Sequence, residues 1–89
     1  MASDIQVYGT DWCGLTERVR RYLTAGDFEY DYFNIDDDQT AEKFVLAANQ
    51  GRRRFPIVVI EDRVVVPPTV AELRRILDQH EMRSSRPPA

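Results

Sequence analysis

Cys13 is the residue best able to carry covalent chemistry in this chain of 89 residues, because it is the only cysteine. It stands in the stretch 8–16 (YGTDWCGLT), which also holds the only tryptophan. A short apolar run, 5–8, precedes it, and apolar residues at i, i+4, i+7 and i+8 from Leu15 predict a helix after it. A thiol in a strand-to-helix turn lies near the unpaired N–H groups of the helix N-terminus, which favour the reactive thiolate.

The helix terminus alone is too weak to ionise Cys13. An ordinary thiol, with a pKa of about 8.5, is only a few per cent thiolate at pH 7, and full activation requires lowering the pKa by roughly two units, about 2.7 kcal/mol. A helix terminus contributes about 0.3–1 kcal/mol, and up to about 2 in favourable geometry. Because Asp11 opposes the shift, further hydrogen bonds or cations are required. The alternative is a buried, unreactive cysteine, but a turn is a surface location and favours reactivity.

Length and composition predict one small globular domain over 1–78, followed by a disordered tail over 79–89 whose last six residues are SSRPPA. The net charge of −3 gives no reason to expect nucleic acid or an anionic membrane as a partner. The sequence has no visible signal peptide and no apolar run of about 18 residues. A single cysteine excludes an intrachain disulfide and fits a reducing, cytoplasmic setting. It also excludes, within one chain, a zinc or iron–sulfur site built on cysteines alone.

The other elements follow from apolar patterning and turn residues. Besides strand 5–8 and helix 14–25, we expect strands at 28–35, 57–60 and 64–66. A second helix is capped by Asp37 or Asp38, carries Ala41, Phe44, Val45 and Ala48 on its apolar face, and ends at residues 49–51. The capping box of Thr69 and Glu72 begins a third helix. The order β-α-β-α-β-β-α predicts an α/β fold with one four-stranded mixed sheet flanked by helices on both faces.

With this order, the chain resembles the glutaredoxins of the thioredoxin fold, and especially the short mycoredoxins of actinobacteria. The matching residues are Tyr8, Thr10, Trp12-Cys13-Gly14, Phe33-Asn34-Ile35-Asp36, Phe44-Val45, Asn49, Gly51, Arg53, Pro56 and Pro68-Thr69. The resemblance implies that Cys13 is the nucleophile and that the Phe55–Pro56 bond is cis. It also implies that this peptide lies beside the cysteine, where its backbone can pair with a bound thiol peptide.

The resemblance further implies a monothiol enzyme, because Thr16 stands where the family's second cysteine would be. Such a protein reduces mixed disulfides between proteins and a low-molecular-weight thiol, glutathione or mycothiol, and we expect a monomer. The alternative is a non-catalytic binding module, which includes a dimer bridging a [2Fe–2S] cluster through Cys13. Two differences disfavour the cluster: residues 8–10 contain no lysine before the cysteine, and 66–68 (VPP) replaces a Gly-Gly pair.

Five further residues carry predicted roles beside Cys13, each with a plainer alternative. Thr16 donates a hydrogen bond to the sulfur, or to the backbone of its own helix turn. Arg53 binds a carboxylate of the thiol cofactor and lowers the cysteine pKa, or is simply solvated. Trp12 forms an apolar rim for a partner protein, or packs on the sheet edge. Tyr8 lies near the thiol or in the core, and Thr69 offers its N–H to a carboxylate or only caps its helix.

Overall fold

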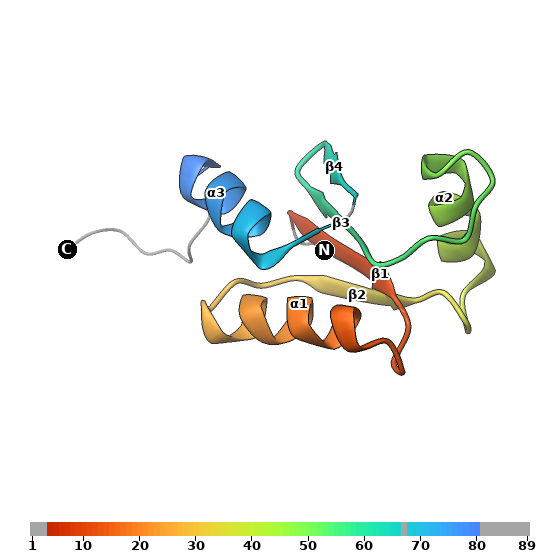
Figure 1. The fold of residues 1–89 in the computed structure, drawn as a ribbon, viewed down its shortest axis with the longest axis horizontal. Helices are drawn as coiled ribbons and strands as arrows, with labels where there is room; N and C mark the ends of the chain where they lie inside the picture. Colours follow the sequence, from red (N-terminus) through yellow and green to blue (C-terminus); the bar gives the residue numbers. More distant parts are fainter. Residues whose placement is uncertain (1–3, 67, 81–89) are drawn as a thin grey trace.

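The computed structural model describes residues 4–66 and 68–80 (Figure 1). Its elements are β1 (Ile5–Gly9), α1 (Gly14–Ala25), β2 (Asp31–Asn34), α2 (Gln39–Ala48), β3 (Ile57–Ile60), β4 (Arg63–Val65) and α3 (Val70–His80). The predicted β-α-β-α-β-β-α order is confirmed.

The four strands form one mixed sheet in the order β2-β1-β3-β4. β2 runs parallel to β1, β3 runs antiparallel to β1, and β4 runs antiparallel to β3. Val7 lies at the centre of the sheet, opposite Tyr32 on one side and Val58 on the other. This arrangement confirms the predicted four-stranded mixed sheet, and it brings the carboxyl ends of β1 and β2 to the same edge.

Two apolar clusters cover the two faces of this sheet. One joins α1 and α3 to the sheet through residues such as Val19, Leu73 and Val7, and the other joins α2 through Val45 and Ile57. Figure 1 shows α2 apart from α1 and α3, with the strands between them. The alternation of side chains along a strand explains the division, because successive residues point to opposite faces.

The caps of the helices differ in a way that matters for the site. The carboxylate of Asp38 accepts a hydrogen bond from the Ala41 N–H at the start of α2. The Thr69 hydroxyl accepts one from the Glu72 N–H at the start of α3. Helix α1 begins at Gly14, and its N-cap residue, Cys13, makes no side-chain cap hydrogen bond. Its first N–H groups therefore stay available to the cysteine sulfur.

Some predicted boundaries were wrong or cannot be compared. β2 is shorter than the predicted strand 28–35 because pairing with β1 spans only Asp31–Asn34. β4 lies one residue earlier than predicted, and Ala48 is exposed, so it is not part of the buried face of α2. α3 continues two residues past 78 to His80. Pro67 and the predicted tail from 81 to 89 lie outside the described residues.

Candidate active site

Cys13 is the N-cap residue of α1 and is partly exposed to solvent. Its backbone is extended, with φ −89° and ψ 121°, as is usual for a residue that precedes a helix. The Cys13 N–H donates to the Thr10 carbonyl at 3.4 Å, and its carbonyl accepts from the Glu17 N–H at 3.0 Å. The tight turn after β1 and the first turn of α1 therefore hold the thiol at the mouth of the helix.

The surroundings of Cys13 lower the pKa of its thiol below the ordinary value. Burial raises this pKa, but the Thr16 hydroxyl and the backbone N–H groups of Thr16 and Leu15 lower it, and together they prevail. Neither Arg53 nor Asp11 contributes to the shift. The thiolate is thus stabilised by hydrogen-bond donors at the helix N-terminus rather than by a neighbouring cation.

Thr16 lies behind Cys13, one turn into the helix, and is 1% exposed. Its hydroxyl is near enough to lower the thiol pKa, yet it makes no hydrogen bond of ordinary geometry within the described residues. The side chain rests against Gly9, where an added Cβ would lie 2.4 Å from Thr16 Oγ1. This buried hydroxyl therefore favours the ionised form of the sulfur, since a charged acceptor makes the stronger hydrogen bond.

The proline loop meets the cysteine loop through two aromatic rings. The Phe55–Pro56 bond is cis, which confirms the prediction, and Pro56 is buried at the start of β3. The Trp12 ring stands edge-on to Phe55, with centroids 5.6 Å apart and an interplanar angle of 87°. This T-shaped contact places the residue before Cys13 against the residue before Pro56.

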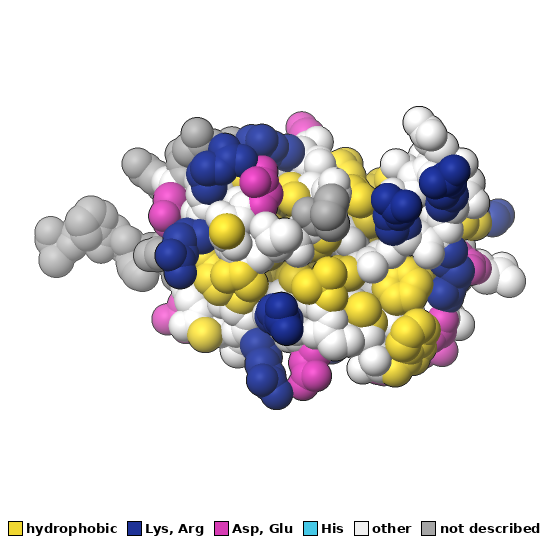
Figure 2. Space-filling view, in the orientation of Figure 1, with side chains coloured by type: hydrophobic (Ala, Val, Ile, Leu, Met, Phe, Trp, Pro, Cys, Tyr) yellow, Lys and Arg dark blue, Asp and Glu magenta, His cyan; other side chains and the backbone are white. Residues whose placement is uncertain are grey.

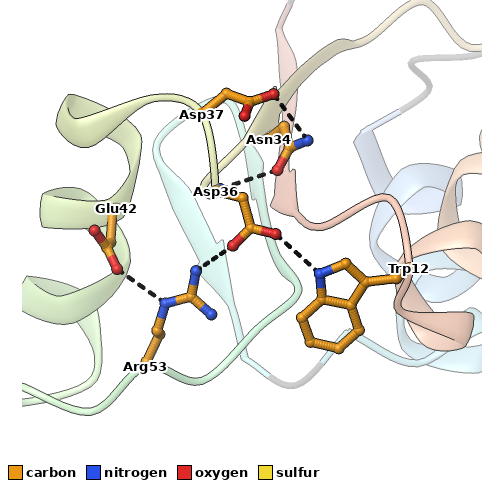
Figure 3. Close-up of polar contacts among 6 residues, drawn as sticks. All are labelled: Trp12, Asn34, Asp36, Asp37, Glu42 and Arg53. Carbon is orange, nitrogen blue, oxygen red and sulfur yellow. Dashed lines mark hydrogen bonds and ion pairs between the residues drawn. The ribbon is translucent and has the colours of Figure 1, made fainter.

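A polar network fixes the outer side of Trp12 (Figure 3). The indole Nε1–H donates to Asp36 at 2.9 Å, and Arg53 Nη2 donates to the other oxygen of that carboxylate at 2.6 Å. Arg53 Nε donates to Glu42 on α2 at 2.9 Å. Trp12 is nevertheless 69% exposed, so its ring forms an apolar surface beside the thiol while its Nε1–H is hydrogen-bonded. Figure 2 shows hydrophobic side chains at the surface beside the turn between β1 and α1.

The fluorescence of the single tryptophan is expected to report the ionisation of Asp36. Hydrogen bonds from Trp12 and Arg53 lower the pKa of this carboxyl, so its charge persists to a lower pH than usual. As pH falls through the lowered pKa, the indole loses its charged acceptor, and the emission of Trp12 should shift in a single titration below the ordinary aspartate range. Acid titration of fluorescence measures this.

Asp36→Asn is the control for that titration, because it keeps an acceptor oxygen and removes the ionisation. The transition should disappear in this variant, while far-UV circular dichroism at the same pH values shows that both proteins stay folded. A transition of equal midpoint in Asp36→Asn would contradict the assignment.

Arg53 lies in the predicted region, but its guanidinium already holds two carboxylates of the chain itself. Hydrogen bonds to Glu42 and Asp36 raise the pKa of Arg53. The guanidinium carbon of Arg53 also lies 5.3 Å from the centroid of the Phe55 ring. A carboxylate from a bound thiol would therefore have to share this guanidinium with Asp36 or displace it.

Within the described residues, neither Tyr8 nor Thr69 makes a hydrogen bond with Cys13. The Tyr8 ring packs between Phe33 and Phe44, with centroids 5.0 and 4.5 Å away, in the cluster beneath α2. Burial and the charge of Asp38 raise the pKa of its hydroxyl. Thr69 caps α3 as predicted, and its role toward a cofactor stays a prediction.

The sequence interpretation missed the acidic partners of the site: Asp36 and Glu42, and the bond between Asp11 and Tyr32. The Tyr32 hydroxyl donates to Asp11 Oδ1 at 2.8 Å. The sequence held two signals for these contacts. Residues that follow two parallel strands meet at one edge of the sheet. The indole N–H of a tryptophan at a surface turn also needs a hydrogen-bond acceptor.

Within residues 4–66 and 68–80, no group of three or more His, Cys, Asp or Glu side chains is arranged to hold a metal ion. None of the helices in that part of the chain is long and apolar enough to cross a membrane.

Comparisons with known proteins agree with this geometry. The glutaredoxin family profile matches residues 5–65. A Mycobacterium tuberculosis protein named as a glutaredoxin is 36% identical over 58 residues, 65% of this chain and 69% of that protein. Mycoredoxin 1 of Corynebacterium glutamicum is 33% identical over 60 residues, 67% of this chain and 73% of that protein.

A solved thioredoxin-like protein superposes with a TM-score of 0.76 at 25% identity, covering 84% of this chain and 95% of the other. It shares the thioredoxin-like α/β architecture described above. The family match covers both loops of the site, from the cysteine turn to the cis-proline. The chain therefore belongs to the glutaredoxin family.

Proposed function

We propose that this chain is a monothiol thiol–disulfide oxidoreductase that reduces mixed disulfides between proteins and a low-molecular-weight thiol. The observation that carries the proposal is the position of Cys13: partly exposed at an uncapped helix N-terminus, with a lowered pKa. Family membership supports thiol–disulfide chemistry, and the single cysteine restricts it to a one-thiol cycle.

In the proposed cycle, the Cys13 thiolate attacks the small-thiol sulfur of the mixed disulfide. The S–S bond breaks, the protein thiolate leaves and takes up a proton, and Cys13 becomes disulfide-bonded to the small thiol. A second small thiol, as its thiolate, attacks that small-thiol sulfur and releases Cys13 and a small-molecule disulfide. The net reaction consumes one small thiol from solution and yields the protein thiol and one small-molecule disulfide. The second step needs this external thiol because Thr16 cannot act as a resolving cysteine.

Glutathione and mycothiol are the two candidates for this small thiol, and the resemblance to mycoredoxin 1 supports mycothiol. Exposed Trp12 and half-buried Phe55 would line the approach of the target beside Cys13. We place the reaction in the cytoplasm, where a lone cysteine stays reduced, and we propose that the chain acts as a monomer.

The test is to mix the reduced protein with a model protein carrying either glutathione or mycothiol on one cysteine. Intact-mass spectrometry should show release of the model protein and an adduct of the small thiol on Cys13, and the faster of the two substrates identifies the thiol. No release from either substrate, with Cys13 still open to alkylation, would contradict the proposal. Visible iron–sulfur absorbance in a purified dimer would instead favour the cluster-binding alternative.

A further inference from the structure

Asp11 is the anion nearest to Cys13 in the chain, with only Trp12 between them. A free carboxylate there would oppose ionisation of the thiol in two ways. It would repel the thiolate, and it would compete for the free N–H groups at the start of α1. With Asp11 hydrogen-bonded to Tyr32, the pKa of Cys13 is set by burial and by hydrogen bonds from Thr16 and Leu15.

Tyr32 holds the Asp11 carboxylate by a hydrogen bond. Its hydroxyl, on strand β2, donates to Asp11 Oδ1 at 2.8 Å and thereby binds the carboxylate at the β2 edge of the sheet. Burial is the largest cause that raises the pKa of Tyr32 well above its usual value. The hydrogen bond to Asp11 and the charge of Asp11 raise it further. The tyrosine therefore remains a donor throughout the working range of pH.

Arg20 in turn holds Tyr32. Its guanidinium carbon lies 3.8 Å from the centroid of the Tyr32 ring, and its Nε donates to the hydroxyl of Tyr30 at 3.2 Å. The arginine is thus stacked on one tyrosine and hydrogen-bonded to the other, in a partly buried position. Arg20 of helix α1 thus packs on the ring whose hydroxyl binds Asp11.

We propose that Tyr32, supported by Arg20, is a positioning residue for the reaction of Cys13. Its hydroxyl keeps the Asp11 carboxylate away from the N-terminus of α1. The N–H groups of Leu15 and Thr16 are then left to the sulfur. The proposal deepens the proposed function, since it assumes that Cys13 reacts as a thiolate, but it does not depend on any particular substrate.

Two other carboxylates of this region are paired with arginines. Asp36 binds Trp12 and Arg53, and Glu17, one turn along α1, forms an ion pair with Arg21 at 3.1 Å. Asp11, in contrast, is bound by the neutral hydroxyl of Tyr32.

The test is the pH dependence of alkylation of the single thiol by iodoacetamide in Tyr32→Phe. Losing the donor frees Asp11, and a unit charge approaching a partly exposed thiolate should raise its pKa by about half a unit. Alkylation below the pKa should then be about threefold slower. Asp11→Asn combined with Tyr32→Phe should restore the original pKa, because no charge remains to be freed.

Tyr30→Phe is the matched control, since it removes the tyrosine hydroxyl that Arg20 binds and leaves the hydrogen bond between Tyr32 and Asp11 in place. Its thiol pKa should be unchanged, and thermal unfolding should show all variants folded. An unchanged pKa in Tyr32→Phe, or an equal rise in the double variant, would overturn the proposal. Because alkylation needs no turnover, such a failure is distinct from a failure to reduce mixed disulfides.

Discussion

Replacing Cys13 by serine is expected to reduce the rate of mixed-disulfide reduction to that of the uncatalysed exchange. The serine hydroxyl is not ionised near neutral pH and cannot form a disulfide, so no covalent intermediate forms. The measurement is the release of a model protein thiol from its small-thiol disulfide, followed at one concentration of reductant with and without the variant.

The same variant should be at least as stable as the original protein, which separates lost chemistry from lost folding. Cys13 is an N-cap residue without a side-chain bond to the helix, and serine is among the best N-cap residues. We expect a gain of up to about 1 kcal/mol in the free energy of unfolding, measured with urea. Residual reduction above background in stable Cys13→Ser would show that another group is the nucleophile.

Thr16→Val is expected to change reactivity and stability in opposite directions. Valine keeps the shape of the side chain against Gly9 and removes the hydroxyl that lowers the pKa of Cys13. A hydrogen bond to a charged group contributes about 1.5–3 kcal/mol, so the thiol pKa should rise by about one unit or more. At neutral pH the alkylation rate should fall about tenfold, as measured by its pH dependence.

The stability of Thr16→Val should hold or increase, because the hydroxyl is buried without an ordinary hydrogen bond in the described part of the chain. Burying such a group costs about 1–3 kcal/mol by protein mutational measures, and a methyl group avoids that cost. Thr16→Ser, which keeps the hydroxyl, is the control and should keep the low pKa. A Thr16→Val protein with both an unchanged thiol pKa and lower stability would assign the hydroxyl a purely structural role.

The fold could be predicted wherever one local pattern determined one element. α1 begins and ends where expected, because the apolar spacing from Leu15 starts after a turn and Gly26 follows the helix. β3 matches its continuous apolar run, Ile57–Ile60, since both faces of this strand are covered. The end of β2 was harder, because pairing is limited by the length of β1 and not by the aromatic residues around it.

The site was predictable in its covalent and backbone parts but not in its polar contacts. The position of Cys13 at a helix start followed from the order of elements, and the cis-proline from the resemblance. The ion pair between Arg53 and Asp36 could not be predicted from local patterns, because the two residues lie in loops far apart in the sequence. The sequence also suggested that Asp11 would oppose ionisation, whereas Tyr32 engages it. Long-range side-chain pairs depend on tertiary register, which local patterns do not contain.

The hydroxyl at Thr16 has a consequence for how long the oxidised protein lasts. Because the chain has no second cysteine, a disulfide between Cys13 and a small thiol cannot be resolved by another thiol of the same chain. In the proposed cycle, the lifetime of that adduct would be set by the concentration of the small thiol that attacks it. The fraction of the protein that carries a small thiol on Cys13 would then fall as the concentration of reductant in the cell rises.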